Sequence, residues 1–186
     1  GGSNSLTLSM GNNVANTDIS ASGAISGVTT LTLQNVGGTA TLSGDVDVTT
    51  LTVGNTVANV AFTGNGSSVA NAVSFANDGD LTLGATNVIQ TYAGGFNTDN
   101  VGGTVSLQGT AIGNDDFTFG DLTLDNSATL QLAAGKILTF EDSLNVGSNT
   151  LTVSADEINF TGGANSVVGT GNLTLEPVST NQNMTV

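Results

Sequence analysis

The amino-acid sequence predicts an all-β protein folded as a parallel β-helix, or β-solenoid, of about eight irregular coils. Three observations lead to this prediction. Short apolar runs alternate with polar residues at the two-residue period of strands, and helical spacing is not seen. Gly, Asn and Asp, which favour turns, separate nearly every pair of runs. A Leu-Thr-Leu or Leu-Thr-Val element recurs at intervals that average about 24 residues.

Each copy of this recurring element is expected to mark one coil. The spacing between copies is uneven because the outer turns can differ in length while the strands stay in register. Its copies are Leu6–Leu8, Leu31–Leu33, Leu51–Val53, Leu81–Leu83, the looser Val105–Leu107, Leu122–Leu124, Leu151–Val153 and Leu173–Leu175. We expect about three strands of three to five residues in each coil. The leucines should point inward and form ladders. The outer face should carry Thr32, Thr52, Thr82, Thr123, Thr152 and Thr174.

Two longer matches support the repeat. The segment 28–33 (VTTLTL) recurs as 48–53 (VTTLTV), and the segment 60–69 recurs much further along the chain as 158–167. The alternative fold is a β-sandwich of about eight longer strands joined by hairpins. The distant second match has no natural place in one sandwich, so it favours the solenoid.

The chain is expected to form a single repetitive domain over residues 1–186, with residues 1–5 and 176–186 as polar tails. It begins with Gly1, without a Met or a signal-peptide pattern, so we expect a processed chain or a piece of a longer one. No apolar run approaches the roughly 18 residues of a membrane helix.

Composition excludes several functions. The chain has no His, no Cys and no Trp, and Lys136 is its only Lys or Arg against 15 Asp and Glu, for a net charge of −14. We therefore expect neither nucleic acid nor an anionic membrane as a partner, because both require cationic side chains. Ser-His-Asp triads, Cys nucleophiles and ordinary zinc or haem sites are excluded by the missing residue types.

The Thr-Leu-Thr-Leu/Val pattern, the Phe-Thr-Gly turns at Phe62 and Phe160, and the Gly, Asn, Thr and Val bias carry a resemblance that covers nearly the whole chain. They resemble the repeat, or shaft, regions of filamentous-haemagglutinin-like and autotransporter-type secreted bacterial surface proteins. That resemblance implies a parallel β-helix and a role as adhesin, matrix component or stalk. The family's secretion-domain Asn-Pro motifs are absent, since Pro177 is the only proline.

Acidic pairs are the candidate metal ligands. Asp78 and Asp80 flank Gly79 and place carboxylate oxygens close together, as calcium requires, and other short acidic pairs occur at Asp45/Asp47 and Asp115/Asp116. Neither an EF-hand loop nor a calcium-binding nonapeptide is present. The alternative interpretation is that these residues serve turns, where Asp bonds its own backbone. We expect no other cofactor.

Catalysis is not expected, although polysaccharide-cleaving enzymes share the predicted fold. The pattern Asn97-Thr98-Asp99 and the pair Asp115-Asp116 resemble parts of galacturonan hydrolases, whose carboxylates act as acid and base. That family also needs a Gly-His-Gly and an Arg-Ile-Lys element, and this chain has neither His nor Arg. Tyr92 and the seven Phe are expected in the core.

The sequence favours a non-catalytic structural or adhesive role, outside the cell or on its surface. We expect head-to-tail self-association, because solenoid ends expose unpaired strands and neither end carries a capping helix. A cell-surface or matrix glycan is a further expected partner. The alternative function is a calcium-dependent surface-layer or glycan-binding module.

Overall fold

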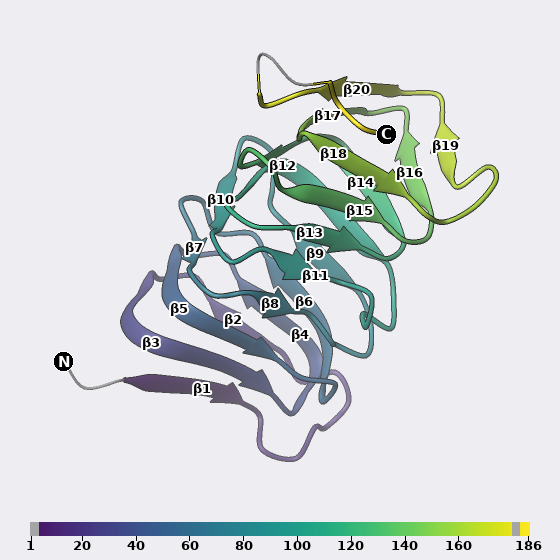
Figure 1. Ribbon diagram of the computed structural model, residues 1–186. Helices are drawn as coiled ribbons and strands as arrows, with labels where there is room; N and C mark the ends of the chain where they lie inside the picture. Colours follow the sequence, from purple (N-terminus) through teal and green to yellow (C-terminus); the bar gives the residue numbers. More distant parts are fainter. Residues whose placement is uncertain (1–3, 180–182) are drawn as a thin grey trace.

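The computed structural model describes residues 4–179 and 183–186 and shows a parallel β-solenoid of about eight turns (Figure 1). All strand pairs among the described residues are parallel, and these residues contain strands but no helix. The predicted fold class is therefore confirmed. The β-sandwich alternative is wrong, because a sandwich requires antiparallel neighbours.

Strand pairing divides the wall of the solenoid into three faces, which we call A, B and C in the order the chain meets them in each turn. Face A contains β2 (Ile19–Ala21), β4 (Val36–Leu42), β6 (Val57–Phe62), β9 (Leu81–Leu83), the first parts of β12 (Val105–Gly113) and β14 (Leu122–Leu132), β16 (Leu144–Gly147) and β19 (Val167–Gly169).

Face B contains the first parts of β3 (Ile25–Gln34) and β5 (Val46–Val53), β7 (Ser68–Val69), β10 (Ile89–Tyr92), the second parts of β12 and β14, β17 (Thr150–Ser154) and β20 (Asn172–Glu176). Face C contains β1 (Ser5–Ser9), the second parts of β3 and β5, β8 (Val73–Ser74), β11 (Phe96–Asn97), β13 (Phe117–Phe119), β15 (Ile137–Phe140) and β18 (Glu157–Phe160).

Four strands, β3, β5, β12 and β14, run across a corner and belong to two faces, so the strands are not uniformly short. Glycine lies at the corner of β12 and at a bulge within the face B part of β3. Gly27 in β3 has φ +70° and Gly109 in β12 has φ +76°, and the pairing register shifts beside each of them. A side chain is strained at positive φ, so glycine allows the strand to bend there.

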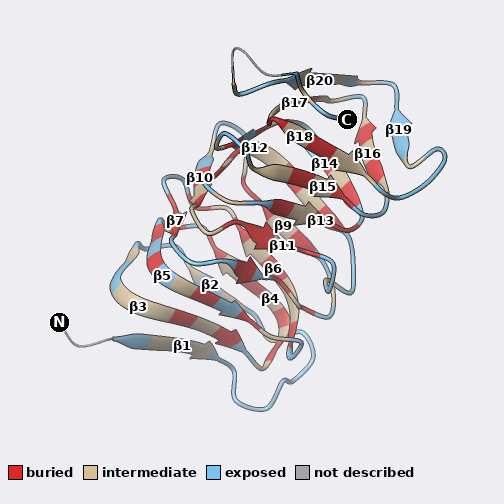
Figure 2. Cartoon of the chain, in the orientation of Figure 1, coloured by how far each residue is buried: buried red, intermediate tan, exposed pale blue. Residues whose placement is uncertain are grey.

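Apolar and polar residues alternate along the strands, and this alternation produces the apolar core. In β9 the burial pattern puts Leu81 and Leu83 inside and leaves Thr82 partly exposed, as expected for a period of two. Figure 2 shows the buried residues as stripes through the middle of the stack, with exposed residues more common at the two ends. Every leucine and valine of the recurring element is buried except those in the end strands β1 and β20.

Aromatic side chains form inner columns along face C. The rings of Phe96 and Phe117 stack with centroids 4.1 Å apart, and Phe140 stacks on Phe119 and on Phe160 at 5.7 and 5.2 Å. Tyr92 and six of the seven Phe are buried, while Phe160 near one end is partly covered. Their expected place in the core is confirmed.

The repeat itself needs a correction. The Leu-Thr-Leu elements do not form one ladder, because β1 and the ends of β3 and β5 lie on face C, the next three copies on face A, and β17 and β20 on face B. The element changes face in the two longest intervals, from Leu51 to Leu81 and from Leu122 to Leu151. Val105 pairs with Leu81 on one side and with Leu122 on the other, so even neighbouring turns differ in length.

The two longer matches behave differently. Val28 pairs with Val48 and Leu31 with Leu51, so the first match is a real structural repeat in register. In the second, more distant match, one segment includes β6 on face A and the other includes β18 on face C. The two segments therefore share a local sequence and turn but occupy different places in the coil. Similar sequence therefore does not imply a similar position around the solenoid.

Both expected tails contain residues that take part in strand pairing. Ser5 belongs to β1 and Glu176 to β20, and Thr185 pairs in parallel with Glu157 of β18. Residues 1–3 and 180–182, which complete the expected tails, lie outside the described residues. Ser5 and Glu176 therefore belong to strands at the edges of the described sheet.

Within the described part of the chain, no helix has the length and apolar character needed to cross a bilayer.

Candidate functional site

Asp78 and Asp80, the candidate calcium ligands, lie at the corner that leads into face A. The Asp80 carboxylate accepts a hydrogen bond of 2.9 Å from the backbone N–H of Thr104 in the next turn. The Asp80 backbone N–H donates in turn to Asn59 Oδ1 of the preceding turn, at 2.8 Å. The Asp78 side chain is exposed. Within residues 4–179 and 183–186, no three potential metal ligands come together, and calcium binding here stays a prediction.

Asp80 is one member of a column of polar residues that share one register position on face A, most of them directly before a strand. Asp18 accepts from the Thr39 N–H at 2.7 Å, and Asp121 accepts from the Ser143 N–H at 3.1 Å. Each side chain thus satisfies a backbone donor one turn away, at a corner where strand pairing stops. The column consists of Asp18, Thr39, Asn59, Asp80, Thr104, Asp121, Ser143 and Ser166.

Sequence reasoning missed this column, although a signal exists. Six of the eight members directly precede the first inward apolar residue of a face A strand, as in Asp80-Leu81 and Asp121-Leu122, whereas Thr39 and Asn59 lie within β4 and β6. The register that aligns these positions comes from pairing between turns and is not visible in a fixed period. The geometry supports the turn interpretation of Asp80.

Asn77, in the same corner, is fully buried. Its Nδ2 donates to the carbonyls of Gly79 and Asp80 at 2.8 and 3.0 Å, which holds the loop that carries both acids. Its Oδ1 has no partner among the described residues. The amide therefore braces the Asp78–Asp80 corner from inside.

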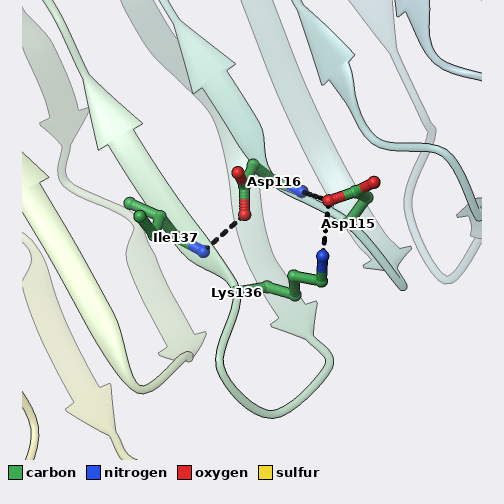
Figure 3. A network of polar contacts seen from close by, with 4 residues as sticks. All are labelled: Asp115, Asp116, Lys136 and Ile137. Atoms are coloured by element: carbon green, nitrogen blue, oxygen red, sulfur yellow. Dashed lines mark hydrogen bonds and ion pairs between the residues drawn. The ribbon is translucent and has the colours of Figure 1, made fainter.

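Asp115 and Asp116 lie at the corner that leads into face C, beside the only lysine (Figure 3). Lys136 Nζ donates to Asp115 Oδ1 at 2.8 Å, and the Asp116 carboxylate accepts from the backbone N–H of Ile137 at 2.8 Å. The hydrogen bond from Lys136 lowers the pKa of Asp115, and Asp115 raises the pKa of Lys136. Both acids thus hold adjacent turns together.

Asn97 and Asp99, the other part of the pattern that resembles galacturonan hydrolases, lie apart from Asp115 and Asp116. Asp99 follows β11, whereas Asp115 and Asp116 precede β13, and β11 and β13 are parallel neighbours. The two groups therefore flank opposite ends of paired strands. Asn97 Nδ2 donates to Asp99 Oδ2 at 2.8 Å and the Asp99 N–H donates to Asn97 Oδ1 at 2.7 Å, which is a local turn bond.

Acidic groups of different turns also meet at the corner after face C. The charge of Asp99, followed by partial desolvation, raises the pKa of Glu141 above its ordinary value of 4.5. Asp99 and Glu141 are two turns apart, with Gly120 in the turn between them. Repulsion between acids of different turns therefore acts at this corner.

Asp156 holds the end of the chain. Its carboxylate accepts from the N–H and hydroxyl of Ser179 at 2.8 and 2.7 Å, and from the N–H of Gly135 at 3.0 Å. The bonds from Ser179 are the main cause that lowers the pKa of Asp156 below its ordinary value of 3.8. Asp156 is 7% exposed. Its hydrogen bonds fix Gly135 and Ser179 to the corner before β18.

A shallow polar groove lies along face B. It has a volume of about 320 Å³ and is lined by hydroxyl, amide and small side chains, without a charged or aromatic group. Thr110, Thr129 and Thr152 pair in register on successive turns and form its floor. Hydroxyls and amides in such a row can hydrogen-bond a polyhydroxylated ligand.

The two ends of the solenoid expose apolar side chains. Seven large hydrophobic residues are exposed among those described, and only Ile89 lies on the shaft. Met10 and Val14 lie near β1 and β2, and Val167, Val168, Val178 and Val186 lie near β19 and β20. The core is therefore covered in the middle turns and is partly exposed to solvent in the end turns.

Comparisons of the chain with protein-family models, with curated proteins and with solved structures return no match. The β-solenoid is therefore established by the strand pairing, and the likeness to filamentous-haemagglutinin-like shafts is carried by the repeat pattern alone.

Proposed function

We propose that this chain is a non-catalytic structural and adhesive segment of an extracellular bacterial surface or matrix protein. The proposal is supported by the unbroken parallel pairing of face A from β2 to β19. This face encloses, with the other two, one continuous apolar core. Each turn is bonded to the turns on both sides, so bending the rod requires many hydrogen bonds to deform together. A stiff spacer is the function that such a shape serves directly.

The composition suits this role outside the cell. The fold uses no disulfide and depends on no redox state, since cysteine is absent. Lys136 is the only trypsin site, and it lies in an ion pair with Asp115. These features are compatible with a long-lived extracellular rod.

Surface exposure is tested with antibodies raised against the purified chain. They should label intact cells or the surrounding matrix of the source organism, with an antibody to a cytoplasmic protein as the negative control. Labelling that appears only after permeabilisation would contradict the proposal. Small-angle scattering of the chain tests the shape, which should be a rod and not a sphere.

A second function, glycan binding, is favoured by the polar groove on face B. The test is calorimetric titration of matrix polysaccharides into the wild type and into Thr129→Val and Thr152→Val, which remove hydroxyls from the groove. Thr174→Val is the matched control, because Thr174 lies in the same column beyond the groove. Weaker binding in all three variants, or in none, would exclude the groove. Titration with and without a chelator tests calcium dependence.

A further inference from the structure

We propose that the groove on face B holds an extended, uncharged polysaccharide chain that runs parallel to the axis of the rod, with one sugar unit beside each turn. This inference rests on the proposed glycan-binding function, because it names the class of glycan and the direction in which it lies. It is carried by the register of hydroxyl groups along the groove, by a recess at the neighbouring corner and by the uncharged lining.

The floor of the groove is a ladder of threonines on successive turns. Thr110 pairs with Thr129, and Thr129 pairs with Thr152, both in register. Thr129 lies between the buried Ala128 and Leu130, so alternation along β14 directs its hydroxyl outward. Since parallel neighbours in a sheet lie about 4.8 Å apart, the ladder presents one hydroxyl at each such step along the axis.

A recess at the corner between faces A and B deepens the groove beside Thr110. Where β12 and β14 pass this corner, β12 has only Gln108 outside the paired register, whereas β14 has residues 125–127. On the other side of β12, residues 84–88 form the corner between β9 and β10. The short corner of β12 therefore lies between two longer ones, and Gly109, which lines the groove there, has no side chain to fill it.

The two longer corners contact each other across this recess. Asn126 Nδ2 donates to Thr86 Oγ1 at 3.2 Å, although the two residues are two turns apart. Thr86 Oγ1 donates in turn to Gln108 Oε1 at 3.4 Å, and Ser127 Oγ accepts from the Thr150 N–H at 3.1 Å. These bonds hold the polar groups of the lining in place before a ligand binds, which reduces the entropy lost on binding.

The lining is uncharged, although the chain as a whole is strongly acidic. The residues that line the groove offer hydroxyl, amide and small apolar groups, while the chain has 15 Asp and Glu against one Lys. Asp125, next to the lining in sequence, accepts a hydrogen bond from Ser106 Oγ of face A at 3.2 Å. The net negative charge repels an acidic polysaccharide, and the groove has no cation to hold one.

An uncharged polysaccharide matches the hydrogen-bonding groups of this lining. Its hydroxyls both donate and accept, and so do the threonine hydroxyls and asparagine amides that line the groove. The glycan class therefore follows from the charge and from the polar groups together.

The direction of the polysaccharide follows from the ladder. A chain that lies across the rod meets one of Thr110, Thr129 and Thr152, whereas a chain that lies along the rod meets all three. In an extended β-linked glucan, each sugar advances by a length close to the spacing between turns, so each sugar lies beside one threonine. An α-linked glucan curves and leaves this line. The register thus favours straight, β-linked chains.

The first test is calorimetric titration of cello-oligosaccharides, from the disaccharide to the hexasaccharide, into the full chain. The dissociation constant should fall with each sugar up to the trisaccharide and then level off, because the ladder within the groove spans three turns. Malto-oligosaccharides and oligogalacturonates of equal length should bind at least about tenfold more weakly. A dissociation constant that does not depend on length, or equal binding of the three series, would overturn the proposal.

Two substitutions locate the sugars on the ladder. Thr129→Val removes the central hydroxyl and should raise the dissociation constant of the trisaccharide at least about threefold. Thr152→Val removes the hydroxyl at one end of the ladder, so the gain in affinity should stop at the disaccharide. A change in this length dependence cannot arise from a general loss of folded protein, and circular dichroism checks each variant.

Thr118→Val on face C is the matched control. Thr118 also lies between two buried residues of a parallel ladder, Phe117 and Phe119, but outside the groove. It should leave the affinity and its length dependence unchanged. Equal weakening by Thr118→Val and Thr129→Val would overturn the assignment of the sugars to face B.

This inference and the proposed functions fail on different results. If no cello-oligosaccharide binds, but a matrix polysaccharide does and is weakened by Thr129→Val and Thr152→Val, the groove binds glycans and the class named here is wrong. If no glycan binds at all, both the inference and the glycan-binding function fail. The structural role is judged separately, from the scattering shape and the surface labelling.

Discussion

Individual side chains divide into inward apolar groups that make the core and outward Thr, Ser and Asn that cover it. Leu83 is fully buried in β9, and its neighbour Thr82 is partly exposed on the outer side. Because adjacent residues of one strand face opposite ways, the pair isolates the value of burial from that of position.

Leu83→Ala should lower the free energy of unfolding by about 2–5 kcal/mol, because it opens a cavity in the core. Thr82→Ala should lower it by less than about 1 kcal/mol. Urea unfolding followed by circular dichroism provides the comparison. The opposite order would mean that the register of β9 is displaced by one residue.

Acidic side chains at the corners act as acceptors for backbone N–H groups of the next turn. Asp80→Ala leaves the Thr104 N–H without its acceptor and should cost about 0.5–1.5 kcal/mol in the free energy of unfolding. Asp78→Ala, at an exposed position in the same loop, should stay within about 0.5 kcal/mol of the wild type. Equal losses that disappear in the presence of a chelator would instead indicate a shared calcium site.

At the scale of the strands, corner residues decide where a strand bends from one face to the next. Gly109 lies in the middle of β12 with φ +76°, and a Cβ there would meet the Ala85 carbonyl oxygen at 2.5 Å. Gly54 lies in a turn where a Cβ would meet no atom within 4 Å, so it provides a matched comparison.

Gly109→Ala should destabilise the protein by at least about 1 kcal/mol, since both the backbone angle and the contact oppose a methyl group. Gly54→Ala should be neutral within about 0.5 kcal/mol. Thermal unfolding of the two variants gives the comparison. If Gly109→Ala is tolerated as well as Gly54→Ala, the bend of β12 does not depend on glycine.

At the scale of the whole molecule, 15 acidic residues and one lysine share a rod whose turns are about 4.8 Å apart. This spacing is shorter than the Debye length of about 8 Å at physiological salt, so acids of neighbouring turns repel one another. Hydrogen bonds to Asp115 and Asp156 oppose that repulsion locally.

Stability should therefore pass through a maximum in mild acid. The raised pKa of Glu141 contributes stability that is present below 4.5 and is lost as the pH rises through the folded-state value. The lowered pKa values of Asp115 and Asp156 contribute stability that is present above 3.8 and is lost as the pH falls. We expect thermal midpoints to rise as the pH falls from neutral towards 4.5, and to fall again below 3.8.

Two variants test which carboxylates cause the change in stability on the acid and alkaline sides of this pH profile. Glu141→Gln should flatten the alkaline side, and Asp156→Asn should weaken the loss on the acid side. A profile that both variants leave unchanged would place the pH dependence in other carboxylates.

Sodium chloride should raise the thermal midpoint at neutral pH, because it screens repulsion among the carboxylates. The increase should shrink in acid, because protonation removes the negative charge that salt screens. An equal increase at both pH values would point to a general effect of salt on apolar burial rather than to charge.

The sequence by itself determined the all-β class, the solenoid and the inward direction of the Leu-Thr-Leu leucines. Alternation and turn residues are local properties, so they can be read without knowing which strands pair. The aromatic core followed in the same way, because Tyr92 and the Phe residues lie within alternating runs.

Only the tertiary structure decided how the repeats are placed. The same Leu-Thr-Leu motif fits any of three faces, since each face needs an inward apolar pair and the corners absorb different numbers of residues. The role of Asp80 also depends on register between turns. Register is set by packing across distant parts of the chain, which no local pattern encodes.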